Sequence, residues 1–162
     1  MKRNILVRYA AAEEAAELGS IMARSFRAAF SGFISRETLD ACAVEENCGA
    51  LMAGIIGEGA MTVLSGFVDG KLMGLLVCSR QPEGRMELEA IHSLPESWGT
   101  GLGDAMLQFA LEEAQAGGTV GLWAFAENKR ARRFYEKHGF TFTGESRVSE
   151  FDGALEVRYE RR

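Results

Sequence analysis

Proline, cysteine and histidine are all scarce in this chain of 162 residues, which contains 2 Pro, 3 Cys and 2 His. At the usual proline usage of ~5%, we would expect about 8 prolines. The cysteines Cys42, Cys48 and Cys78 are odd in number and form no Cys-x-x-Cys pair. We therefore expect neither a disulfide framework nor a metal site. The thiols are predicted to be buried, in a protein of the reducing cytoplasm.

Long apolar runs are missing as well. The longest stretch of apolar residues and glycine covers residues 49–57, whereas a bilayer-spanning helix needs roughly 20 such residues. Near the N-terminus the apolar run 5–7 ends at Arg8, which is too short for a secretory signal. The formal net charge of −5 argues against binding of nucleic acid by the whole surface. We expect a cytoplasmic protein with no membrane partner and no nucleic-acid partner.

Glycine, by contrast, is abundant. The chain has 19 glycines, where the usual ~7% would give about 11. The hydrophobic content of 47% is that of an ordinary globular protein. The length suits one domain, since typical domains run roughly 100–200 residues. We therefore predict a single domain over residues 1–162, and we ask where its glycines gather.

Hydrophobic periodicity predicts a mixed α/β or α+β domain. Helices are expected at residues 11–30, from 35 to a point between 50 and 59, at 101–116 and at 128–138. Strands are expected at residues 4–9, 61–68, 71–80, 85–94, 119–126, 140–149 and 154–160. Asp69 and Gly70 between two of these strands are typical of a two-residue hairpin turn.

Three glycines, Gly99, Gly101 and Gly103, lie between an expected strand and an expected helix. Such a loop, followed by a helix N-terminus, favours phosphate binding through backbone amides. A plain loop-closing turn remains an equal alternative. Two well-known nucleotide loops are excluded: no Gly-Lys-Ser/Thr sequence exists, and the G-x-G-x-G spacing differs from the dinucleotide pattern G-x-G-x-x-G.

Residues 127–140 form a basic segment in an acidic protein. The segment carries a charge of +3 and the rest of the chain −8. A local positive stripe suits an anionic ligand, although a solvated helix face is the more common explanation of such a segment. Asn128 is a suitable N-cap. Tyr135 lies on the apolar face, where a tyrosine is by default part of the core.

Taken in order, these segments resemble the GCN5-related N-acetyltransferase (GNAT) family. That family typically shows E-[IL]-x-x-[IL]-x-V-x-P, then Q/R-x-x-G-x-G/A, then N-x-x-A-x-x-x-Y-x-x-x-G-F. This chain reads E-L-E-A-I-H-S-L-P at 87–95, W-G-T-G-L-G at 98–103 and N-K-R-A-R-R-F-Y-E-K-H-G-F at 128–140. The resemblance covers residues 60–145, just over half of the chain.

The resemblance implies a mixed, mostly antiparallel sheet of about six to seven strands with about four helices. A parallel strand pair is expected to splay apart at the cofactor site. The implied activity is transfer of an acetyl group from acetyl-CoA to an amine, by direct attack with both substrates bound and without a metal. The acceptor would be a small molecule, an amino-acid or antibiotic amine, or a peptide amine. A homodimer is left open.

The resemblance also implies roles for individual residues. Glu87 matches the usual base, Glu89 is the alternative base, and Tyr135 matches the acid that protonates the departing thiolate. Trp98 replaces the usual Gln or Arg of the loop, and Asp104 is expected to point away from the phosphates. The cofactor would be bound by Ile91, Ser93, Trp98, Gly99, Thr100, Gly101, Leu102, Gly103, Asp104, Asn128 and Ala131.

The acceptor side carries no motif. Phe26, Phe30 and Phe33 either wall an acceptor pocket or belong to the core, since their spacing fits both. Two rival functions remain open. One is a non-catalytic module that senses acetyl-CoA, and the other is an acyltransferase that uses a longer acyl-CoA.

Overall fold

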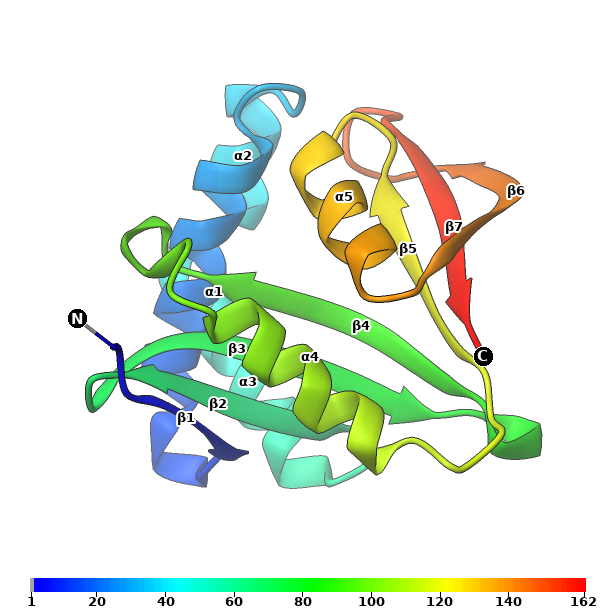
Figure 1. Cartoon of the computed structure of the whole chain (residues 1–162). Helices are drawn as coiled ribbons and strands as arrows, with labels where there is room; N and C mark the ends of the chain where they lie inside the picture. Colours follow the sequence, from blue (N-terminus) through cyan, green and yellow to red (C-terminus); the bar gives the residue numbers. More distant parts are fainter. Residues whose placement is uncertain (1) are drawn as a thin grey trace.

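A computed structural model describes residues 2–162 and shows one seven-stranded sheet in the order β1-β2-β3-β4-β5-β7-β6 (Figure 1). The strands are β1 (Ile5–Tyr9), β2 (Thr62–Val68), β3 (Lys71–Arg80), β4 (Met86–Ser93), β5 (Val120–Phe125), β6 (Thr141–Val148) and β7 (Leu155–Arg161). The helices are α1 (Ala15–Phe30), α2 (Arg36–Cys42), α3 (Glu45–Glu58), α4 (Leu102–Glu113) and α5 (Lys129–Lys137). Short 3-10 turns cover Ala12–Glu14, Pro82–Gly84 and Pro95–Ser97. The predicted mixed, mostly antiparallel fold is confirmed.

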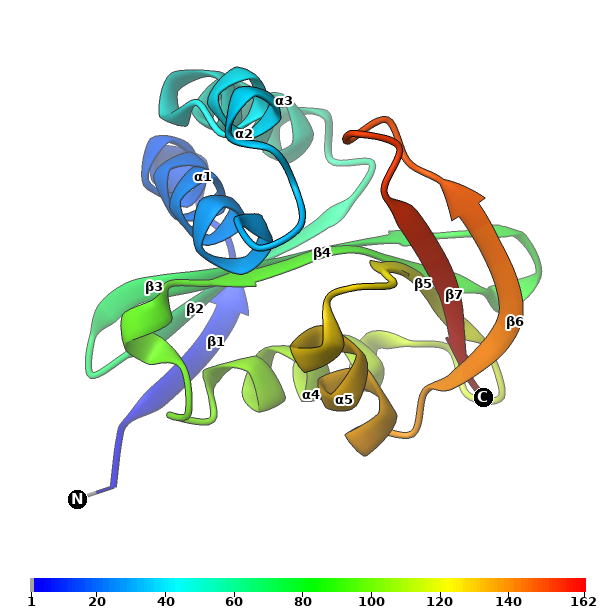
Figure 2. The ribbon, with the colours of Figure 1, turned by 90° about the horizontal axis from the view of Figure 1, so that it is seen from above.

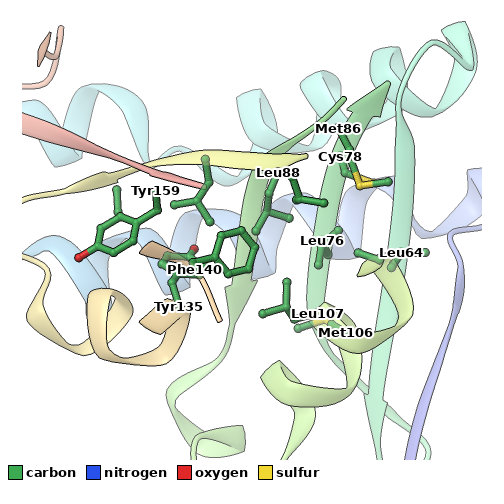
Figure 3. Close-up of a cluster of buried hydrophobic side chains, with 14 of the residues drawn as sticks. Leu64, Leu76, Cys78, Met86, Leu88, Met106, Leu107, Tyr135, Phe140 and Tyr159 are labelled. Atoms are coloured by element: carbon green, nitrogen blue, oxygen red, sulfur yellow. The ribbon is translucent and has the colours of Figure 1, made fainter. Parts of the chain in front are cut away.

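Helices cover both faces of the sheet. Viewed from above, α1, α2 and α3 lie on one side, and α4 and α5 lie on the other (Figure 2). The main core fills the space between the sheet and the α4–α5 layer, where Leu88, Leu107, Tyr135 and Phe140 pack together (Figure 3). A second core lies against α1 and α3. Each sheet face is therefore buried by a separate apolar cluster.

The helix expected to start at residue 35 is in fact two helices. Ser35 caps α2, because its side chain accepts a hydrogen bond from the Thr38 amide. The helix then ends because Ala43 leaves helical geometry at φ −90° and ψ 59°. Val44 follows in extended conformation, and α3 begins at Glu45. The described chain has five α-helices instead of the expected four.

The hairpin between β2 and β3 follows the sequence prediction. Asp69 and Gly70 both have positive φ, 51° and 81°, as a type I′ turn requires.

The parallel pair β4–β5 is held together only at its beginning. Met86 pairs with Val120, and Glu87 pairs with Gly121. Beyond these residues the strands separate, as Figure 1 shows. A register shift in the β3–β4 pair adds to the distortion, because Val77 pairs with Ala90 and Cys78 with Leu88. Glu89 is the residue that this shift leaves without a partner across the strands.

Helices α1 and α3 approach each other at a glycine. A Cβ atom on Gly19 would lie on the backbone N and Cα of Gly49, well inside van der Waals contact. The reverse does not hold, because a Cβ on Gly49 would meet nothing closer than the Ala16 Cα at 3.5 Å. Only Gly19 therefore needs to be glycine for this contact.

We expect Gly19→Ala to destabilise the protein by about 2 kcal/mol, because the added methyl pushes two packed helices apart. Gly49→Ala is the matched control, and it should be neutral or stabilising by up to ~1 kcal/mol, since alanine favours the helix over glycine. Urea unfolding of both variants measures the difference. Equal stability of the two variants would contradict the proposed contact.

Candidate functional site

The separation of β4 and β5 opens into a cavity of about 790 Å³. Its walls come from α1, β4, the loop that leads into α4, β5, α5 and the segment around Phe151. The cavity therefore reaches both layers of helices through the gap in the sheet.

Most of the predicted cofactor residues line this cavity. They are Ile91, Ser93, Trp98, Gly99, Gly101, Leu102, Gly103, Asp104, Asn128 and Ala131. Thr100 does not line it; its hydroxyl donates a hydrogen bond to the Ser97 carbonyl at 2.5 Å and holds the loop. Asn128 is the N-cap of α5, as predicted, and its side chain accepts a hydrogen bond from the Ala131 amide at 3.2 Å.

The glycine loop turns because two of its residues adopt left-handed geometry. Gly99 has φ 81° and Gly101 has φ 94°, values that side chains with a Cβ rarely allow. Gly101 is the N-cap of α4, and the first intrahelical bond is donated by Ala105 to the Gly101 carbonyl. The amides of Gly103 and Asp104 precede that bond at the positive end of the helix dipole, whereas the Leu102 amide donates to the Thr100 hydroxyl at 3.4 Å. This arrangement favours an anion.

Arg130 adds a cation that is not among the predicted site residues. Its guanidinium lies 3.6 Å from the centre of the Trp98 ring and lines the cavity. The Trp98 indole N–H donates to the Ser93 carbonyl at 3.1 Å, which fixes the ring beside the loop. Trp98 thus takes the place of a polar loop residue and holds an arginine there instead. The only sequence signal for Arg130 was its place in the basic segment 127–140.

The Asp104 carboxylate is neutralised by α5. It accepts a hydrogen bond from the Lys137 ammonium at 3.3 Å and lies 2.6 Å from the His138 Nε2. Burial alone would raise the pKa of Asp104, but the contacts with His138 and Lys137 outweigh it and lower that pKa. The carboxylate is directed at these α5 side chains, which removes most of its repulsion toward an anion at the loop.

Tyr135 is both a core residue and a wall of the cavity. Only 8% of it is exposed, and its ring packs edge-on against Phe140 (Figure 3). It also packs edge-on against Phe134. Burial raises the pKa of its hydroxyl above the usual range. The phenol therefore stays protonated at neutral pH and is a potential proton donor within the cavity.

The two candidate bases have different surroundings. Both oxygens of Glu87 accept hydrogen bonds from Arg158, at 2.6 and 3.0 Å, and Glu87 does not line the cavity. Gly121 makes room for this pair, because a Cβ there would collide with the guanidinium. Glu89 does line the cavity, and its carboxylate accepts a hydrogen bond from the Ser79 hydroxyl at 2.7 Å. The geometry therefore favours Glu89 as the base.

Of the three phenylalanines considered for the acceptor pocket, two line the cavity and one does not. Phe26 and Phe30 line the cavity, whereas Phe33 does not and packs on Phe30 and Phe125. His92 also lines the cavity beside Phe26 and Phe30, and burial lowers its pKa to about 4. The imidazole is consequently neutral at pH 7.

The cysteines lie away from this site. Cys48 and Cys78 are buried, Cys42 is only half-buried, and all three are free thiols. The prediction of buried thiols is therefore wrong for Cys42. Among residues 2–162, no group of three or more His, Cys, Asp or Glu side chains is placed to hold a metal ion. The same residues form no helix long and apolar enough to cross a membrane.

Comparison with known proteins places this site in a family. The family model described as "Acetyltransferase (GNAT) family" matches residues 16–140. An uncharacterized N-acetyltransferase of Mycobacterium bovis is 28% identical over 133 residues, which cover 81% of this chain and 85% of that protein.

Two solved structures share the fold. The PaiA N-acetyltransferase of Thermoplasma acidophilum in complex with coenzyme A has a TM-score of 0.80 at 18% identity, covering 98% of this chain and 99% of its own. The acetyltransferase YncA of Salmonella typhimurium, solved with acetyl-CoA, has a TM-score of 0.72 at 18% identity, covering 98% and 94%. The family model and the acetyltransferase motifs together show that the chain belongs to the GNAT family and is an acetyltransferase that uses acetyl-CoA.

Proposed function

We propose that this protein transfers the acetyl group of acetyl-CoA directly to a primary amine, with both substrates bound in the cavity between β4 and β5. The observation that carries the proposal is the set of groups that line this one cavity. A helix N-terminus, an exposed carboxylate and a buried, protonated phenol all line it.

The donor binds on the α5 side. The pyrophosphate accepts hydrogen bonds from the amides of Gly101, Gly103 and Asp104, and Arg130 supplies the positive charge. The pantetheine arm follows the open edge of β4. The Leu94 amide donates to the Met73 carbonyl of β3, so by alternation the backbone groups of Ser93 and Ile91 face the opposite edge. Asn128 and Ala131 form the facing wall.

The reaction needs three proton transfers, two from the nitrogen and one to the sulfur. A primary amine with a pKa near 10 is mostly protonated at neutral pH and must lose a proton before it attacks. Glu89 accepts that proton, directly or through water. The amine nitrogen then bonds to the thioester carbon, the C–S bond breaks, and the CoA thiolate takes a proton from the Tyr135 hydroxyl. The nitrogen carries one further proton after the attack and releases it to water, and water returns a proton to the Tyr135 oxygen.

The alternative of a non-catalytic acetyl-CoA sensor rests on two departures from the family pattern, Trp98 and Asp104. The structure weakens both grounds. Arg130 restores a cation beside Trp98, and Lys137 and His138 neutralise Asp104. Glu89 and Tyr135 line the cavity as a catalytic site requires. We therefore favour the enzyme.

We expect Tyr135→Phe to lower turnover about 100-fold, because a general acid contributes at least that much. Acetyl-CoA binding should be nearly unchanged, since the ring remains. Thiol release across a panel of amines measures turnover, and calorimetry measures binding. Tyr159→Phe is the matched control, because Tyr159 is a fully buried tyrosine that does not line the cavity. Its hydroxyl forms hydrogen bonds with Arg132 and Glu136. Unchanged turnover of Tyr135→Phe would remove Tyr135 from the mechanism.

Glu89→Gln and Glu87→Gln separate the two carboxylates. The first should lower kcat about 100-fold at neutral pH through loss of the base. The second should change kcat less than about threefold but lower the melting temperature, because Arg158 is 11% exposed and loses the closer of its two ionic partners, with only Glu160 remaining at 3.6 Å. Steady-state kinetics and thermal unfolding of both variants provide the readouts. The opposite pattern would assign the base to Glu87.

Arg130→Ala should weaken acetyl-CoA binding about tenfold, the loss expected for one charge-assisted hydrogen bond to a phosphate. The loss should shrink as salt is added, because screening reduces the contribution of an exposed charge. Arg133→Ala removes a charge from the same helix outside the cavity and should bind normally. Equal affinities of the two variants, measured by calorimetry, would exclude the role of Arg130.

A further inference from the structure

The α1 side of the cavity has an aromatic wall that acetyl-CoA binding on the α5 side leaves unused. The wall is built by residues of α1, β4, β5 and the β6–β7 connection, namely Phe26, Phe30, His92, Trp123, Phe125 and Phe151. All of these rings line the cavity. The two sides of the gap therefore differ in chemistry: helix amides and basic groups accompany the rings on the α5 side, whereas the α1 side is mainly aromatic.

The rings pack into a continuous surface. The centres of Phe26 and Phe30 are 4.3 Å apart, and those of Phe30 and Phe125 are 4.9 Å apart, both edge to face. The ring centre of Phe151, in the β6–β7 connection, lies 5.4 Å from that of Phe26 and extends the wall beyond α1. Such an arrangement presents edges and faces that pack favourably against a further aromatic ring.

One carboxylate at this wall is free to meet a cation. Glu89 forms no ion pair within residues 2–162 and is exposed. Glu156 also lines the cavity, but Arg147 donates a hydrogen bond to it at 3.0 Å. His92 is neutral, as described above, and does not repel a cation. The wall therefore offers a single unpaired negative charge.

The cations near this wall are already engaged. Arg147 bonds to Glu156 and stacks on Trp123 at 4.3 Å, and Arg158 holds Glu87 at two points. The cavity-lining basic residues Arg130 and Lys137 belong to α5, on the donor side. A carboxylate on the acceptor would consequently lose its hydration without gaining a partner. A second ammonium group would likewise lack a partner of its own.

We propose that the acceptor is a monoamine carried on an aromatic ring, with no carboxylate. The ring packs against Phe26 and Phe30, and the amine lies at Glu89, where it loses its proton. This inference rests on the proposed function and specifies its acceptor.

The test compares kcat/KM for 2-phenylethylamine, hexylamine, phenylalanine and spermidine with acetyl-CoA as donor. 2-Phenylethylamine should exceed each of the other three at least tenfold. Hexylamine tests the need for the ring, phenylalanine tests rejection of the carboxylate, and spermidine tests rejection of further charge. A faster reaction with any of the three would overturn the proposal.

Variants of the wall provide a second test. Phe30→Ala should raise KM for 2-phenylethylamine about tenfold and leave acetyl-CoA affinity unchanged. Phe33→Ala is the matched control, because Phe33 packs behind the wall without lining the cavity. Circular dichroism and thermal unfolding establish that both variants are folded. An equal KM for the two variants would contradict a role of the wall in acceptor binding.

The panel also distinguishes this inference from the proposed function. Thiol release with spermidine or phenylalanine, but not with 2-phenylethylamine, would refute the carboxylate-free aromatic monoamine as acceptor and retain the acetyltransferase. Binding of acetyl-CoA without thiol release on any amine, peptide amines included, would refute the proposed catalysis itself.

Discussion

Pairing between β4 and β5 stops after Glu87 and Gly121, and the site depends on this interruption. If β4 and β5 stayed paired along their length, the backbone groups of Ser93 and Ile91 would form hydrogen bonds within the sheet. The sheet would then leave no passage between the two helix layers. The pair is nevertheless anchored firmly where it begins, because Arg158 of β7 reaches across Gly121 to hold both oxygens of Glu87. An ion pair at the closed end and an open edge beyond it together make a rigid gap.

The gap separates two electrostatic environments. On the α5 side, helix amides and Arg130 create a positive potential, and Asp104, the acid that lines the cavity there, is paired with Lys137 and His138. On the α1 side Arg147 and Arg158 are paired with carboxylates, and of the two acids that line the cavity there, Glu89 forms no ion pair within the described residues. In the function proposed above, these environments attract an anionic donor and a cationic acceptor to opposite sides of the gap.

Sequence motifs predicted most of the residues that line the α5 side of the cavity, because that side is built from short contiguous segments. The loop 98–104 and the start of α5 each depend on local rules: glycine at positive φ, a helix N-terminus and an Asn cap. The strands and the β2–β3 turn followed from periodicity in the same way. The split between α2 and α3 escaped prediction because Ala43 and Val44 carry no strong helix-ending signal.

The roles of Glu87, Glu89 and Arg130 were decided by partners distant in sequence. Glu87 and Glu89 are equivalent acids two residues apart on one strand, and only Arg158, 71 positions away, distinguishes them. In the sequence Arg130 is one of several basic residues of segment 127–140, and only its contact with Trp98 places it at the loop. The sequence by itself thus determined the family, the donor and the cofactor loop, since these depend on local backbone chemistry. Tertiary structure alone decided which carboxylate is free and which rings form the acceptor wall, because burial and charge pairing depend on contacts between distant segments.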